Sequence, residues 1–498
     1  MAARATRILQ RSRQTGQAPF HVPGHKRGQG TLEQFGEVMG PASLCCDLTE
    51  LAGLDYLASP TGCIAEAQDL AASAFGAQRT WFLVNGSTVG IQAAILAACG
   101  EGGDLLAARN CHASAFSAMV LAGCKPWYVQ PEFDAELGIA HGVTPAALRA
   151  AFLRIPPASR PTAAIVVSPT YFGVCSDIAG LAGVCRQFGA ALIVDEAHGS
   201  HFAFHENFPQ AALAAGADLV IQSSHKTLSA LTQAAMLHQG RGSGVPAERI
   251  SGALLLLQSS SPSYLLLASL DAARAHAQVP ASSCEPLQAA EAIRQSLDGL
   301  PGIGLLDERH ISRLQLPSGT AEAMDPLRLT LSFGRLGLTG QQAAALLEAD
   351  HGVVPELATQ QVVVLALGPG TTGQHAKQLV AALKSLCCSY PMRVAADSMA
   401  PQSAQPMGRP DLTDLSFPEH VLTPRQAVFA PTQRVALEDA VGHVSAETMC
   451  PYPPGVPVLV PGERIGRQAI QQLCTVLENG GTVTGASDST LQTVLVVA

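Results

Sequence analysis

The chain is poor in charge, has no long apolar run and contains no C-x-x-C pair. Charged residues make up only 14% of its 498 residues, and the net charge of −9 argues against a surface that binds nucleic acid or an anionic membrane. No apolar run reaches the roughly 18 residues that a membrane-spanning helix needs. The first 15 residues carry four arginines with no apolar segment behind them, so we expect no secretory signal.

The 13 cysteines show no metal-ligand spacing. The adjacent pairs Cys45–Cys46 and Cys387–Cys388 are poorly placed for a disulfide within each pair. These features favour reduced thiols, a cytoplasmic location and no metal site. Hydrophobic residues make up 47% of the chain, which is long enough for two or three domains with a sizeable core.

Short apolar runs alternate with segments of helical periodicity from residue 61 onward. The runs predict strands at 81–84, 104–107, 127–129, 163–167, 191–194, 219–221 and 234–237. The periodic segments predict helices at 64–75, 87–99, 145–155 and 178–188. Strands that alternate with helices indicate an α/β fold, in which a mostly parallel sheet is covered on both faces.

Composition also suggests where domains begin and end. Residues 1 to about 60 are expected to be irregular, and a small α+β region is expected to contain strands at 327–333 and 362–367 and a helix at 340–348. A third region is expected to contain a helix at 424–429 and the proline-rich stretch 450–457. We therefore predict an N-terminal arm, a large domain, a small domain, a linker and a C-terminal domain at 1–30, 31–285, 286–394, 395–410 and 411–498.

The most informative residues are Asp195 and Lys226, each at the end of an apolar run. In an open α/β sheet, ligands bind at the carboxyl ends of the strands. Lysine can form an imine with an aldehyde, and a buried carboxylate can pair with a protonated ring nitrogen, so the two groups suit pyridoxal phosphate (PLP). Taken singly, Lys226 is more often a surface lysine, and Asp195 can instead cap a helix.

Other polar residues follow strands in the same way. The turn Asn85–Thr88 precedes a helix, where backbone N–H groups and the hydroxyls of Ser87 and Thr88 can bind an anion; the alternative is an ordinary helix cap. His112 also follows a strand and can stack on a flat ring, although a lone histidine is more often structural. His198 is three residues past Asp195 and is expected to point into the same cleft.

With these motifs in this order, the chain resembles the Orn/Lys/Arg decarboxylase family of fold type I PLP-dependent enzymes. The matching segments span nearly the whole chain and are 19–26, 47–51, 62–68, 85–88, 109–112, 195–199, 223–226, 259–264, 450–455 and 461–463. The chain is similar to the short form, which has no N-terminal receiver-like domain. The resemblance implies an aspartate-aminotransferase-like large domain followed by smaller α+β C-terminal domains.

The resemblance also implies roles for individual residues. Lys226 would carry PLP, Asp195 would pair with its pyridinium nitrogen, and His112 would stack on its ring. His198, or Lys226 once released, is a candidate proton donor. The residues implied to hold the phosphate are Ser87, Thr88, Ser224, His225 and, from the partner subunit of a homodimer, Ser260. The chain departs from the family pattern at three positions. Ala113 stands where the family often has lysine, Ala52 stands where it often has proline, and Ile221 is bulkier than the small residue expected there. None of these changes removes a chemical group that the mechanism needs.

The implied reaction is decarboxylation of a basic L-amino acid to a polyamine-type amine and CO2. Glu463, after the proline-rich stretch, is predicted to accept the substrate's distal cation, with a solvated surface acid as the alternative. Two other functions stay open: an aminotransferase or lyase, in which Arg328 grips the α-carboxylate, and a PLP-binding protein without catalysis. Arginine is slightly favoured over lysine and ornithine, and assembly beyond a dimer is left open.

Overall fold

The computed structural model describes residues 18–392, 419–452, 455–478 and 480–498. The predicted linker at 395–410 and most of the predicted N-terminal arm lie outside these residues. The predicted boundaries near residues 30 and 285 remain predictions. None of the helices in the described ranges has the length and apolar character needed to cross a membrane.

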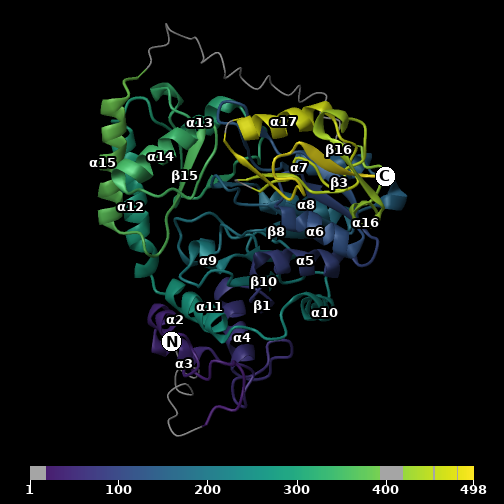
Figure 1. Cartoon of the computed structure of the whole chain (residues 1–498), viewed down its shortest axis with the longest axis vertical. Coiled ribbons are helices and arrows are strands. Elements are labelled where there is room, and N and C mark those ends of the chain that lie inside the picture. Colours follow the sequence, from purple (N-terminus) through teal and green to yellow (C-terminus); the bar gives the residue numbers. More distant parts are fainter. Residues whose placement is uncertain (1–17, 393–418, 453–454, 479) are drawn as a thin grey trace.

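A seven-stranded sheet forms the centre of the large domain (Figure 1). Its order is β1 (Arg79–Leu83), β10 (Ala235–Gln239), β9 (Leu219–Gln222), β8 (Ala191–Asp195), β6 (Ala163–Val167), β2 (Asp104–Ala108) and β3 (Lys125–Val129). Only β10 runs antiparallel to its neighbours. The sheet is therefore mostly parallel, as predicted.

Helices cover both faces of this sheet, and β1 shows how its side chains alternate between them. Trp81 and Leu83 join the larger core, which includes residues of α5 (Gly86–Cys99) and α10 (Ala247–Leu257). Phe82 faces a second core with α4 (Cys63–Phe75) and α11 (Tyr264–Ala277). The remaining helices of this domain are α6 (Ala113–Ala122), α7 (Pro145–Arg154) and α8 (Ile178–Phe188). Burial on both faces explains why the central strands are continuous apolar runs.

The small α+β region contains an antiparallel four-stranded sheet. Its strands, in order, are β11 (Gly304–Leu305), β13 (Arg328–Ser332), β15 (Val362–Ala366) and β14 (Leu357–Ala358). The helices are α12 (Ala281–Leu297), α13 (Glu308–Leu314), α14 (Gly340–His351) and α15 (Gly373–Ser389). The pairing of β12 (Ala323–Met324) with β7 (Val174–Cys175) joins this region to the large domain, and Arg328 at the start of β13 contacts His198 in the turn after β8.

The C-terminal elements lie beside β3 and α6 of the large domain (Figure 1). They comprise α16 (Pro424–Phe429), α17 (Arg467–Glu478) and two strand pairs, β16 (Thr432–Ala436) with β19 (Thr493–Val497) and β17 (Cys450–Tyr452) with β18 (Thr482–Thr484). Residues such as Met449, Leu473 and Val494 give this part a core of its own.

One expectation was wrong. Within residues 18–60, expected to be irregular, the chain forms α2 (Glu33–Met39) and α3 (Pro41–Cys46). Gly40, with φ of 73°, separates the two helices. Phe35, Val38 and Met39 of α2 stand at helical spacing, but the helix has only seven residues, which is too short for its period to reveal a helix in the sequence.

Candidate active site

Three separate segments of the chain meet at Lys226, which lies in the short helix α9 (Ser224–Thr227) directly after β9. Its Nζ is 3.1 Å from Nε2 of His198, in the turn that follows β8. On the other side of that ring, Nδ1 lies 2.9 Å from a guanidinium nitrogen of Arg328, the first residue of β13. The sequence placed Lys226 and His198 in one cleft, and the structure brings them into contact.

The contacts of His198 define where its proton lies. Arginine can only donate hydrogen bonds, so Arg328 makes Nδ1 of His198 an acceptor. Burial, together with the positive charge of Arg328, holds the pKa of His198 well below its usual value, and the ring is therefore neutral. A neutral ring that accepts at Nδ1 carries its hydrogen on Nε2. That hydrogen points at Lys226, which must accept it as an unprotonated amine.

The surroundings of Lys226 favour the same unprotonated state. Part of the side chain remains open to solvent in the single chain, but the neighbouring protein atoms desolvate the ammonium and lower its pKa. The charge of Arg328 lowers this pKa further, while Asp195 opposes the shift. An unprotonated amine is the form that attacks an aldehyde, so Lys226 is prepared for a covalent bond to PLP.

Asp195, the last residue of β8, is buried and poorly paired. Among the residues that the structure describes, only the backbone N–H of Ala197 donates to its side chain, at 3.2 Å. Burial raises the pKa of Asp195, and the positive charges of Lys226 and His112 counteract only part of that shift. A buried carboxylate without a hydrogen-bonded cation is costly. The site therefore suits a ligand that brings a positive charge, as a pyridinium nitrogen does.

His112 and Tyr171 border the same site. Nδ1 of His112 accepts a hydrogen bond from the backbone N–H of Ser114 at 3.2 Å, which caps α6 and fixes the ring. Burial lowers the pKa of His112, and charges on Asp195 and Lys226 also act on it. The Tyr171 ring lies 4.8 Å from the His198 ring, and Nζ of Lys226 is 5.8 Å from its centre.

The residues predicted to hold a phosphate gather near the start of α5 and in α9. Ser223 Oγ donates to Ser87 Oγ at 2.8 Å, and His225 Nδ1 donates to the carbonyl of Ala234 at 3.0 Å. The hydroxyls of Ser224 and Thr227 are buried and have no hydrogen-bond partner among the described residues. Buried hydroxyls of this kind call for a ligand, and the N-terminus of the 14-residue helix α5 favours an anion.

Thr88 and Ser260 are both exposed in the single chain. Thr88 lies in the first turn of α5. Ser260 lies between α10 and α11, next to Ser259, whose backbone N–H donates to Asn85 Oδ1 at 3.0 Å. This part of the chain therefore approaches the anion-binding turn of its own subunit. Contact of Ser260 with the phosphate of a partner subunit stays a prediction.

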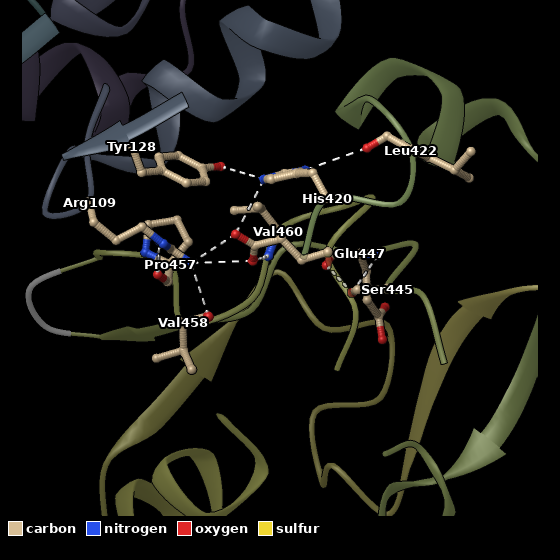
Figure 2. A network of polar contacts seen from close by, with 10 residues as sticks. Arg109, Tyr128, His420, Leu422, Ser445, Glu447, Pro457, Val458 and Val460 are labelled. Atoms are coloured by element: carbon tan, nitrogen blue, oxygen red, sulfur yellow. Dashed lines mark hydrogen bonds and ion pairs between the residues drawn. The ribbon is translucent and has the colours of Figure 1, made fainter. Parts of the chain in front are cut away.

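Glu463 is fully buried, so the alternative of a solvated surface acid is wrong. Its Oε2 lies 3.3 Å from a guanidinium nitrogen of Arg109, and its Oε1 lies 3.5 Å from Nε2 of His420. Figure 2 shows both of these partners, with the ring nitrogen of His420 bonded to the hydroxyl of Tyr128. Oε2 of Glu463 also accepts from the backbone N–H of Val460 at 3.0 Å. These contacts already occupy the carboxylate. They weigh against the predicted role in binding the substrate's distal cation, which stays a prediction.

Two family models match this chain. That of the Orn/Lys/Arg decarboxylase major domain matches residues 5–375, and that of the Orn/Lys/Arg decarboxylase C-terminal domain matches residues 412–483. The chain belongs to the Orn/Lys/Arg decarboxylase family. It is 36% identical to an arginine decarboxylase of Bacillus subtilis over 96% of this chain and 94% of that protein. It is 26% identical to a lysine decarboxylase of Pseudomonas aeruginosa over 92% of this chain and 73% of that protein.

Comparison with solved structures confirms the predicted fold of this chain. A lysine decarboxylase from Pseudomonas aeruginosa superposes with a TM-score of 0.82 at 22% identity, covering 99% of this chain and 80% of that one. The constitutive lysine decarboxylase of Escherichia coli gives a TM-score of 0.80 at 22% identity, covering 99% and 82%. The α/β fold is thus that of fold type I PLP-dependent enzymes.

The sequence-based predictions omitted some residues of the site and gave others a different role. Tyr171 was missed, although it follows the predicted strand at 163–167 and strand ends are where ligands bind. Arg328 was considered only as a grip for a carboxylate. Arg109 was noted only as part of the motif that contains His112. No local pattern could reveal the contact of Arg328 with His198, because 130 residues separate the two.

Proposed function

We propose that this protein decarboxylates a basic L-amino acid to the corresponding polyamine-type amine and CO2, with arginine as the first candidate substrate. The observation that carries the proposal is the contact of His198 with Lys226 on one side of its ring and with Arg328 on the other, beside the buried Asp195. Membership of the decarboxylase family supports the reaction, and the similarity to an arginine decarboxylase supports the choice of substrate.

The residues fit PLP as the cofactor. Asp195 would pair with the ring nitrogen, His112 would stack on the ring, and Lys226 would bond to the aldehyde carbon. The residues that would hold the phosphate are Ser87, Thr88, Ser224 and His225, and the unpartnered hydroxyl of Thr227 joins them. When bound, PLP supplies an electron sink for the pair released from the Cα–carboxylate bond.

The side chains around this site have distinct tasks in the reaction. Asp195 holds a proton on the ring nitrogen by charge, in a buried setting where that interaction is strong. His198 presents Nε2–H toward Lys226 Nζ and so orients that amine. Once the substrate has displaced it, Lys226 takes up the proton of the substrate's ammonium group and is the group that returns a proton to Cα after CO2 leaves. Arg328 keeps Nδ1 of His198 occupied and so maintains this tautomer.

A substrate panel tests the proposal. Purified protein with added PLP is supplied with arginine, lysine or ornithine, one at a time, and CO2, amine and keto acid are measured. We expect CO2 and amine in equal amounts, with the highest kcat/KM for arginine. Keto acid without CO2 would instead support an aminotransferase, for which Arg328 beside Lys226 could hold the α-carboxylate. No product from any of the three amino acids would refute the proposed reaction.

A further inference from the structure

Arg109 connects the large domain to the C-terminal domain. It is three residues before His112, in the turn that follows β2. One guanidinium nitrogen donates to the carbonyl of Pro457 at 2.6 Å, and the other donates to the carbonyl of Val458 at 3.1 Å. The second nitrogen also lies 3.3 Å from Oε2 of Glu463. The guanidinium group of an arginine carries five N–H donors in one plane, which lets a single side chain make these three contacts in different directions.

The large domain holds Arg109 in place through two aromatic rings. The guanidinium carbon lies 5.4 Å from the ring centre of Phe116 in α6 and 5.3 Å from that of Tyr128 in β3. These are cation–π distances. Tyr128 itself reaches the C-terminal domain, because its hydroxyl lies 3.0 Å from Nε2 of His420. The arginine is therefore fixed on one domain and bonded to the other.

Glu463 is the matching anchor in the C-terminal domain. It is fully buried, its Oε2 accepts from the N–H of Val460, and Nε2 of His420 lies 3.5 Å from its Oε1. The Arg109 side chain is only 12% exposed. Removing one partner of such a buried ion pair leaves the other charge uncompensated, which is strongly unfavourable.

The segment bound by Arg109 reaches the ring of His112. Gly455 is two residues before Pro457, and a Cβ atom on Gly455 would lie 3.7 Å from Cδ2 of His112. The φ of Gly455 is +83°, a conformation that favours glycine, so the backbone itself approaches the ring. A shift of the carbonyls of Pro457 and Val458 would move Gly455 away from His112.

We propose that Arg109 and Glu463 form an interdomain clamp that positions segment 455–463 against His112 and thereby completes the PLP pocket. Both are positioning residues, and Glu463 is not the acceptor for the substrate's distal cation. The inference rests on the proposed function in one respect, namely that His112 contacts the cofactor.

The test compares Arg109→Met, Glu463→Gln and the double variant with wild type. A matched control is Glu419→Gln, which removes the exposed partner of Arg464, an ion pair of 2.9 Å in the same domain. Hydrogen exchange of the apoprotein measures protection of segment 455–463 and of α17. The affinity of the apoprotein for PLP and the values of kcat and KM complete the comparison.

We expect each single variant to lose protection in segment 455–463 while α17 stays protected. PLP affinity should fall about tenfold, with kcat reduced and KM changed little, and the double variant should be no worse than either single variant. The control should match wild type. If Arg109→Met does not fold, Arg109→Lys, which keeps the charge but loses the fork, should show a smaller loss of the same kind.

Two results would overturn the clamp. One is unchanged protection of segment 455–463 in both single variants. The other is a Glu463→Gln variant with normal PLP affinity and a strongly raised KM for the basic substrate, which would make Glu463 a substrate acceptor after all. If wild type itself binds no PLP, the proposed function fails, whereas hydrogen exchange of the apoprotein still tests the clamp.

Discussion

Lys226 is the residue on which the cofactor assignment depends most directly. Replacing it with alanine removes the amine that can bond to PLP, so we expect Lys226→Ala to lose both the visible absorbance of lysine-bound PLP and all release of CO2. The exposed Lys384, on α15, provides the control, and Lys384→Ala should keep both properties. Absorbance spectra and a CO2 assay decide the question. If Lys226→Ala turned over at the wild-type rate, Lys226 could not be the residue that bonds to PLP.

Asp195 should matter far more for turnover than for folding. Its charge is destabilised by burial in the absence of a ligand, as its raised pKa indicates, and Asp195→Asn removes that charge with little change in shape. We expect kcat to fall on the order of 100-fold or more, because a charge-assisted contact in a water-poor site is lost. The thermal unfolding midpoint should change little. A decrease in kcat of only a few-fold would mean that Asp195 is a structural acid.

Among the structural elements, a buried chain of polar side chains joins four strands of the sheet below the site. Glu196, directly after β8, accepts from Gln222 of β9 at 2.7 Å. Gln222 bonds to His238 of β10 at 3.1 Å, and His238 bonds to Thr80 of β1 at 2.8 Å. Because Gln222 immediately precedes the segment that contains Lys226, this chain helps to fix the floor of the site.

Glu196 gives these strands a predictable dependence on pH. Burial raises the pKa of Glu196 to about 8, although hydrogen bonds from Gln222 and Ala212 lower it somewhat. The stabilisation from the protonated form is fully present below the usual pKa of 4.5 and is lost as pH rises toward about 8. The loss is at most about 1.4 kcal/mol per pH unit. Glu196→Gln should remove this slope, and thermal unfolding between about pH 5 and pH 9 measures it. Parallel curves for the two proteins would contradict the prediction.

The sequence revealed the elements that have a clear apolar pattern. The bounds of β6 and α8 match the predicted strand and helix, because one is buried throughout and the other is strongly amphipathic. It did not reveal α6, which is apolar on most sides and so lacks a period. The sequence allowed Lys226 and Asp195 to be assigned to one site, because the carboxyl ends of parallel strands meet at the same edge of a sheet. Arg109 and Glu463 could not, because they lie 354 residues apart and no local rule relates them.

At the scale of the whole molecule, the N-terminal end of the described chain is unusually apolar for a surface. Phe20, Leu32 and Val38 are 94%, 71% and 83% exposed. Figure 1 shows α2 and α3 at the end of the molecule that carries α11, and α3 packs against α11. The exposed Ser260 lies in the loop that precedes α11. The exposed apolar side chains and the predicted phosphate contact thus both lie on segments next to α11, one by packing and one in sequence.

A homodimer would cover this surface, and we expect the active protein to be at least a dimer. Obligate interfaces of this kind bury on the order of 2,000 Å² or more, so single substitutions should weaken the dimer only when they place a charge inside it. Light scattering should therefore show a dimer or larger for wild type and a shift toward monomer for Val38→Asp, with a parallel loss of PLP affinity. Leu153→Asp, on α7 and 69% exposed, provides the control and should stay assembled. A monomer that is fully active at assay concentration would show that each subunit builds its site alone, and Ser260 would then have no role across a subunit boundary.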